Sequence, residues 1–287
     1  MDLRVFFQTF INGISLSLIY VLFALGLTLI MGIFDVCNFA YGEFVMVAGF
    51  VAYLLIGKWG LPYILAPIAA MVIVSLLGIV FEKGIFYPMR NRGGLEPALA
   101  TFGASGALQT IALLIFGGNP KGVPPLINGK VKLFGSIFFS MNRLPIIIGS
   151  LFMISLLFIF VQRTKVGLAI RAVQQDQEAA ALQGINIGNM RMVVWVVASC
   201  LAAAAGILLA PISYVDPFMG SGLLLKGFAV VIMGGMGSIP GALLGGFILG
   251  LVDSFGQTYL GTASYMFAFA FIILVLIIRP QGILGKR

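Results

Sequence analysis

Long apolar runs separated by short polar breaks fill almost the whole sequence. Each run is close to the roughly 20 residues that a helix needs to cross the hydrocarbon core of a membrane. The pattern therefore predicts an all-α, polytopic helical bundle of about eight or nine spans. The expected spans lie at about 6–33, 44–57, 62–82, 97–116, 144–161, 192–212 and 263–278, with a short apolar piece at 223–234 and a long glycine-rich helix that carries Asp253.

One polar segment, 163–191, interrupts this pattern in the middle of the chain, with the sequence RTKVGLAIRAVQQDQEAAALQGINIGNMR. Its Ala-rich centre consists of good helix formers. Gly167 precedes this centre, and Gly184 and Gly188 follow it as helix stops. We interpret the segment as a short helix at the membrane surface that receives force from a soluble partner.

The composition agrees with a membrane protein. The chain has 287 residues, of which 61% are hydrophobic and 9% charged, whereas globular chains average about 45–50% apolar and about 25% charged residues. Little sequence is left for a soluble catalytic domain, so we treat 1–287 as one transmembrane domain. The apolar run after Arg4 lacks a convincing cleavage site and is interpreted as a retained span.

The distribution of basic residues predicts the topology. The net charge of +8 needs no nucleic acid as partner, because basic residues collect in cytoplasmic loops. Segments 83–96, 163–191 and 279–287 hold 10 of the 17 basic residues, which places them inside. This arrangement makes the C-terminus cytoplasmic and the N-terminus external, and it requires 218–236 to cross as a short span.

The loop 117–143 is then the longest external segment. Its Gly, Pro and Asn content predicts turns, and VKLFGSIFF within it predicts a small hairpin. The loop either connects two spans or also helps to dock an external partner.

Polar side chains inside the apolar runs are candidates for a pathway. The stretch FDVCNFAYGEF, 34–44, is either an interfacial turn or a broken helix whose backbone lines a translocation path. Thr101, Ser105 and Gln109 are spaced four apart and share one helical face, which forms either a hydrogen-bonded seam or a pore wall. Two small-xxx-small pairs allow close helix packing, and they consist of Gly241, Gly245, Gly246 and Gly250.

The sequence lacks the residues that several kinds of chemistry require. No GxxxxGK[ST] motif is present to bind ATP, and the chain has no histidine. Cys37 and Cys200 do not have metal-ligand spacing. We therefore expect no catalytic site, no metal and no cofactor, and a role in moving a solute rather than in catalysis.

Three stretches resemble one family, the H-type permease subunit of branched-chain amino acid (Liv-type) ABC importers. They are NGISLSLIYVLFALGLTLIMGIFDVCNFAYGEF at the start, GLAIRAVQQDQEAAALQGIN in the centre, and LLKGFAVVIMGGMGSIPGALLGGFILGLVDS with IIRPQGILG near the end. They extend from residue 12 to residue 285, so the resemblance covers essentially the whole chain.

The resemblance implies a subunit of a bacterial inner-membrane importer that passes branched-chain or related small amino acids inward. Its partners would be a second, M-type permease subunit, two cytoplasmic ATPases that hydrolyse ATP, and an external substrate-binding protein. Related permeases serve urea and short amides, which is the first alternative. An ion-driven secondary amino acid transporter is the second alternative.

The resemblance also assigns residues to roles. The central motif matches a segment that couples to the ATPases, with Gly167, Arg171, Ala172, Asp176, Glu178, Ala179, Ala180 and Gly184, and we add Leu182 as an apolar contact. The first motif matches at Asn38, Phe39, Gly42 and Glu43, but Tyr41 stands where the family commonly has His. A path for a zwitterion needs polar groups without a strong trap, and the sparse set that fits is Asn12, Asn38, Tyr41, Glu43, Gln109 and Asp253.

Overall fold

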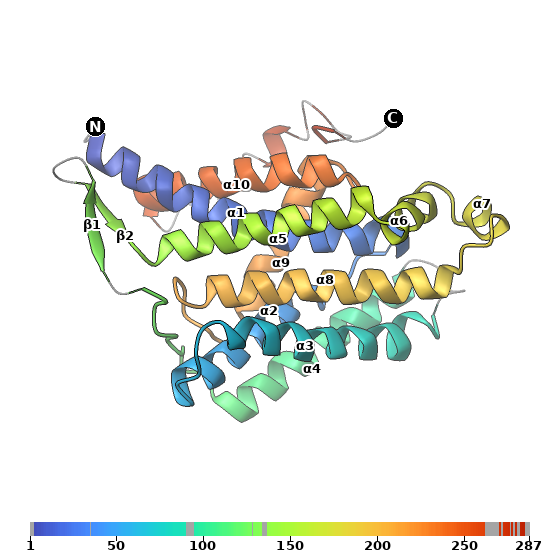
Figure 1. The fold of residues 1–287 in the computed structure, drawn as a ribbon, viewed down its shortest axis with the longest axis horizontal. Coiled ribbons are helices and arrows are strands. Elements are labelled where there is room, and N and C mark those ends of the chain that lie inside the picture. Colours follow the sequence, from blue (N-terminus) through green and yellow to red (C-terminus); the bar gives the residue numbers. More distant parts are fainter. Residues whose placement is uncertain are drawn as a thin grey trace.

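The protein is a bundle of long helices with one small hairpin, as a computed structural model shows (Figure 1). The structure describes residues 3–34, 36–89, 95–127, 129–133, 137–261, 270, 272–275, 277, 279 and 282–284. The helices are α1 (Leu3–Phe34), α2 (Tyr41–Ala52), α3 (Leu65–Phe81), α4 (Leu95–Phe116), α5 (Arg143–Arg163), α6 (Lys165–Gln175), α7 (Gln177–Leu182), α8 (Ile187–Leu209), α9 (Met219–Gly234) and α10 (Ile239–Leu260). Wider π-helical turns, η1 (Tyr53–Lys58) and η2 (Glu82–Phe86), extend α2 and α3.

The expected all-α polytopic class is confirmed. Within the described residues, seven helices are long and apolar enough to cross a membrane, and α9, with 16 residues, is a shorter apolar helix. The helix boundaries follow the apolar runs of the sequence closely. The last expected span, 263–278, and the basic tail, 279–287, lie mainly outside the described residues.

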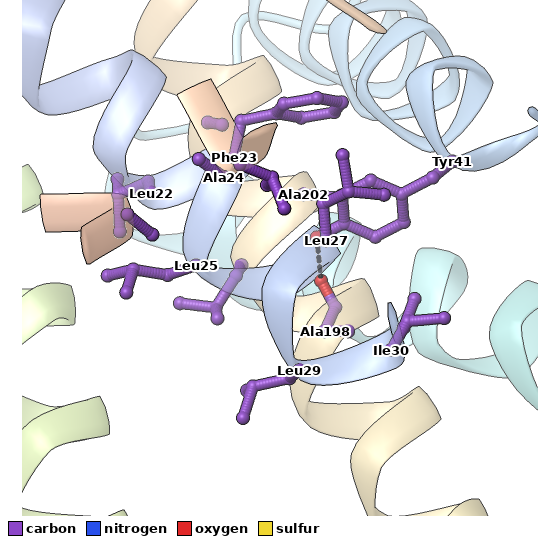
Figure 2. Close-up of a cluster of buried hydrophobic side chains, with 14 of the residues drawn as sticks. Leu22, Phe23, Ala24, Leu25, Leu27, Leu29, Ile30, Tyr41, Ala198 and Ala202 are labelled. Atoms are coloured by element: carbon purple, nitrogen blue, oxygen red, sulfur yellow. Dashed lines mark hydrogen bonds between the residues drawn. The ribbon is translucent and has the colours of Figure 1, made fainter. Parts of the chain in front are cut away.

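Helix α1 forms the centre of the bundle. In its most apolar window 89% of the residues are buried inside the protein, compared with 17% in α4 and 22% in α5. A helix that is apolar on all sides is buried either among other helices or in lipid. Helices α5, α8, α9 and α10 all pack against α1, and its side chains from Leu22 to Ile30 fill the core drawn in Figure 2.

Glycines bring α10 close to two neighbours at once. Gly241 and Gly245 lie against the backbone of α9, near Gly234 and Val230. Gly246 and Gly250 lie against Val21 and Ser17 of α1. The two small-xxx-small pairs therefore face different helices, and Ser17 Oγ donates a hydrogen bond to the Phe247 carbonyl at 2.8 Å across the second contact.

The loop between α4 and α5 contains the expected hairpin. Strands β1 (Lys130–Leu133) and β2 (Ile137–Ser140) pair antiparallel, with Val131 opposite Phe139. Earlier in the loop, Lys121 exchanges two backbone hydrogen bonds with Val215, of 2.8 and 2.9 Å. This loop thus fixes the segment between α8 and α9, at the end of the bundle opposite α6 and α7 (Figure 1).

The α1–α10 contact yields a stability prediction. In Gly250→Leu the new side chain meets the Ser17 backbone, so we expect the overpacking to lower stability by about 1–3 kcal/mol or more. Thermal denaturation in detergent, followed by size-exclusion chromatography, measures this loss. Gly103→Leu on α4 is the matched control, because a Cβ there meets nothing within 4 Å. Equal melting temperatures for the two variants would contradict the close contact.

Candidate functional site

The polar central segment forms two short helices where the sequence pattern suggested one. Helix α6 begins after Thr164, whose Oγ1 accepts a hydrogen bond from the Gly167 amide at 2.9 Å. Asp176 has an extended backbone (φ −158°, ψ 111°), and its Oδ1 accepts from the Ala179 amide at 2.9 Å. Asp176 therefore ends α6 and caps α7, since a side-chain acceptor at this position satisfies a free helical N–H.

The inner side of this segment packs against the bundle. Gly167, Ile170, Val173 and Ala180 are buried there. A Cβ on Gly167 would meet the backbone of Val161 at the end of α5. Gly167 and Ala180 thus hold the segment in place, whereas Arg171 and Ala172 are half-buried beside them.

The outer side of α7 is open. Asp176, Glu178 and Ala179 are exposed, and Leu182 is 87% exposed, the largest fraction for any large apolar side chain among the described residues. Gly184, two residues after the end of α7, has φ +82°, a conformation that favours glycine. An exposed leucine beside carboxylates forms a compact knob that is suited to contact with another protein.

The last three residues of α1 contact this segment in succession, at what we name the coupling junction. Gly32 lies against the Gln174 amide, where a Cβ would come within 2.8 Å of Nε2. Gln177 Nε2 donates to the Ile33 carbonyl at 2.6 Å. The Arg191 guanidinium lies 5.4 Å from the centre of the Phe34 ring.

Arg191 closes the coupling junction from α8. Its Nη2 donates to Gln177 Oε1 at 3.2 Å, so the Gln177 amide bridges α1 and α8. The last carbonyl groups of a helix lack partners within the helix, and Gln177 supplies one. Helices α6 and α7 are therefore anchored to the end of the central helix.

A short non-helical connection joins α1 to α2 directly beyond this junction. Asn38 and Ala40 are buried, and Asn38 Oδ1 accepts from the Ala40 amide at 3.0 Å. The Phe39 amide donates to Thr101 Oγ1 at 3.1 Å. The segment 36–40 is thus a non-helical break between α1 and α2, with one hydrogen bond to α4, and Asp35 lies outside the described residues.

Glu43, one turn into α2, is the centre of a buried polar cluster. Its Oε1 accepts hydrogen bonds from Ser105 Oγ at 3.0 Å and from Gln109 Nε2 at 2.7 Å. Gln109 Nε2 also donates to Ser221 Oγ of α9 at 2.8 Å. The Thr101–Ser105–Gln109 stripe therefore faces α2, and the cluster ties together α2, α4 and α9.

Tyr41 contacts the hydrophobic core, whereas Glu43 belongs to the polar cluster. It is fully buried, and its hydroxyl donates to the Ala198 carbonyl at 2.7 Å (Figure 2). The ring packs 4.9 Å from the Phe23 ring, and Gly26 leaves the space that it fills. The phenol thus joins α2 to α8.

Two of the expected path residues lie elsewhere, toward the end of the bundle opposite α7. Asp253 of α10 is buried, and its Oδ2 accepts from Lys226 Nζ at 2.7 Å and from Tyr20 Oη at 2.6 Å. Asn12 lies nearby, on the wall of a cavity of about 510 Å³. The sequence analysis missed Lys226 as the partner of Asp253, although both charges lie in apolar helices, where charges need partners.

The expected path residues therefore form two groups. Asn38, Tyr41, Glu43 and Gln109 lie around α2, whereas Asn12 and Asp253 lie around the cavity. Cys37 and Cys200 are both free thiols. Among the described residues, no group of three or more His, Cys, Asp or Glu side chains has the arrangement of a metal site.

The architecture is that of a membrane permease, in which a polar segment is anchored to a core of apolar helices. The family described as "Branched-chain amino acid transport system / permease component" matches residues 9–278, so the chain belongs to this family. It is a multi-pass inner-membrane protein.

Individual relatives cover nearly the full chain. The high-affinity branched-chain amino acid transport system permease protein LivH of Salmonella typhimurium is 34% identical over 98% of this chain and 96% of its own length. BraD of Pseudomonas aeruginosa, described in the same words, is 33% identical over the same shares. The ribose import permease RbsC of Escherichia coli is 27% identical over 90% of this chain and 78% of its own length. No solved structure matches the chain.

The coupling junction yields a local prediction. Gln177→Ala removes the bonds to Ile33 and Arg191, and one hydrogen bond contributes about 1 kcal/mol. We expect the amides of α7 to exchange hydrogen about fivefold faster, or more, in a mass-spectrometric exchange experiment. Gln183→Ala, at an exposed position after α7, is the control. Unchanged exchange in Gln177→Ala would show that this side chain does not anchor α7.

Proposed function

We propose that this chain forms half of the membrane pathway of an ATP-binding-cassette importer for branched-chain or related small amino acids. A second, M-type permease subunit would complete the pathway, two cytoplasmic ATPases would hydrolyse ATP, and an external binding protein would deliver the solute. The observation that carries this proposal is the 163–191 segment, with its exposed outer side and its inner side anchored to α1.

The arrangement supports a mechanical role for this segment. Leu182 and Glu178 would contact a cleft of an ATPase, because they lie on the exposed side of α7. Movement of the ATPase would then displace α7 and, through Gln177 and Arg191, the end of α1. Since α1 is enclosed by its neighbours, such a displacement reaches the whole bundle.

The Glu43 cluster is the proposed element that responds within the membrane. It lies just beyond the helix break that follows the coupling junction, and it joins three helices through Gln109. Gln109 is half-buried, so this side chain reaches the surface of the bundle while Glu43 does not. We propose that α4 and α9, where they meet around Gln109, form part of the pathway wall. Asn38 and Tyr41 would support this wall from the side of the core.

The amino acid substrate follows from the relatives. LivH and BraD are described as branched-chain amino acid permeases, and RbsC as a ribose permease. The amino acid permeases have higher sequence identity to this chain and match more of it than RbsC does, so leucine is the solute to test first.

Transport by the complete complex tests the proposal. The chain would be co-purified with its partners, reconstituted into proteoliposomes and assayed for radiolabelled leucine uptake, with ATP on the ATPase side and the binding protein on the other. We expect uptake only when both are present. Uptake without ATP would establish secondary transport. ATPase activity that the binding protein stimulates without leucine uptake would direct the search to other solutes, with urea and short amides first.

Charge reversal on the α7 knob gives a prediction about coupling. Glu178 is exposed, so Glu178→Lys should leave insertion and folding intact while placing a repulsive charge in the ATPase contact. We expect ATP hydrolysis to continue and leucine uptake per ATP to fall severalfold. Neutral Glu178→Gln should have a small effect, because one exposed ion pair contributes only about 0–1 kcal/mol. Full uptake by Glu178→Lys would exclude this residue from coupling.

A further inference from the structure

The cavity of about 510 Å³ lies at the end of the bundle opposite the coupling segment, within this one chain. Its walls come from α1, α5, the end of α8, α9, α10 and the 210–218 loop. Tyr214 and Phe218 at its edge are mainly exposed, and the bond between Lys121 and Val215 fixes the loop that carries them. The cavity therefore opens at the end that the charge distribution places outside the membrane.

The polar part of the cavity carries separated charges. Lys226 is neutralised by Asp253, with which it forms an ion pair of 2.7 Å. Arg143 donates to the Asn12 carbonyl at 3.4 Å, and Asp216 Oδ1 accepts from the Phe218 amide at 2.8 Å. Neither Arg143 nor Asp216 has an ion-pair partner among the described residues, so one cation and one anion remain available on the lining.

The rest of the lining combines polar side chains, among them Ser254, Gln257 and Thr258 of α10, with one apolar wall. The apolar wall comes from Leu16 of α1, Leu209 at the end of α8, Ile212 in the 210–218 loop and Leu223 of α9. Small-molecule sites commonly enclose about 300–1,000 Å³ and combine apolar walls with a few polar groups. This cavity has that size and an apolar wall, and it has more polar groups than such sites commonly have.

We propose that this cavity is a binding site for a free α-amino acid with an apolar side chain, occupied before the solute enters the pathway. Arg143 binds the carboxylate, Asp216 binds the ammonium group, and the leucine-lined wall receives the side chain. A zwitterion matches one unpaired cation and one unpaired anion, whereas a simple anion would leave Asp216 without a partner. The choice of an amino acid rests on the proposed function, and the site itself on the cavity and its charges.

A substitution on helix α9 can fill the cavity without disturbing the fold. Met219, Gly222, Leu223 and Lys226 all line it, and this spacing places them on one helical face. A Cβ on Gly222 would meet nothing within 4 Å. Gly222→Met should therefore fill the cavity while leaving the helix contacts intact. Gly122→Met, in the loop at the same end and equally uncrowded, is the matched control.

Binding of radiolabelled L-leucine to the whole transporter in nanodiscs, without ATP and without the binding protein, tests the site. We expect saturable binding that Gly222→Met abolishes and Gly122→Met preserves. Arg143→Gln and Asp216→Asn should each weaken binding about tenfold or more, as the loss of a charge-assisted bond does. The Asn side chain keeps an oxygen to accept from the Phe218 amide. Arg4→Gln, which removes a charge outside the cavity at the same end, should bind normally.

Two analogues that compete with leucine for the site show which charged group of the ligand each of these residues contacts. L-Leucinamide lacks the carboxylate, so its affinity should not change in Arg143→Gln, and 4-methylpentanoate lacks the ammonium group and should not respond to Asp216→Asn. Absence of saturable leucine binding, or wild-type binding by Gly222→Met, would overturn the site. ATP-driven uptake by the same preparation would separate that result from failure of the proposed function.

Discussion

The enclosure of α1 is the constraint on which the rest of the structure depends. A helix that carries apolar side chains on every side has no polar face to turn toward water, and here its neighbours also leave it little lipid contact. Helices α5, α8, α9 and α10 surround it, and glycines of α10 allow the closest approach. The hydrophobic effect does little to hold helices together in lipid, so close packing and internal hydrogen bonds, such as that of Ser17 with Phe247, have to stabilise the bundle.

Enclosure also makes α1 a connection between the two ends of the protein. At one end, Gly32, Ile33 and Phe34 contact the coupling segment. Toward the other end, Tyr20 contacts the ion pair of Lys226 and Asp253 beside the cavity. A displacement of α7 that moves α1 would therefore reach both the Glu43 cluster, through the helix break, and the cavity.

The sequence predicted the helices well because hydropathy in a membrane is a local property. The expected spans at 97–116 and 144–161 agree with α4 and α5 to within two residues at each end, and the hairpin was also expected. The division of the coupling segment at Asp176 was missed, because Ala and Gln favour a continuous helix, although an Asp before a helical run is a recognisable cap. Gln177 with Ile33 and Lys226 with Asp253 are pairs 144 and 27 residues apart, and no local pattern joins such residues. For the same reason, the residues that were expected to line one path lie in two separate groups in the structure.

The central claim is that the 163–191 segment, α6 and α7 together, moves with the end of α1. A Cβ at Gly32 would lie 3.5 Å from Gln174 Cγ, so Gly32→Cys with Gln174→Cys should form a disulfide. Cys37 and Cys200 are the only native cysteines and would be replaced by Ser. The decisive measurement is ATP-driven leucine uptake by this double variant before and after oxidation. Uptake that is retained to within about twofold, the result the account predicts, would show that the junction moves as one body. Loss of uptake on oxidation, restored by reduction, would show that the 163–191 segment must separate from α1 at α6 and would contradict the account.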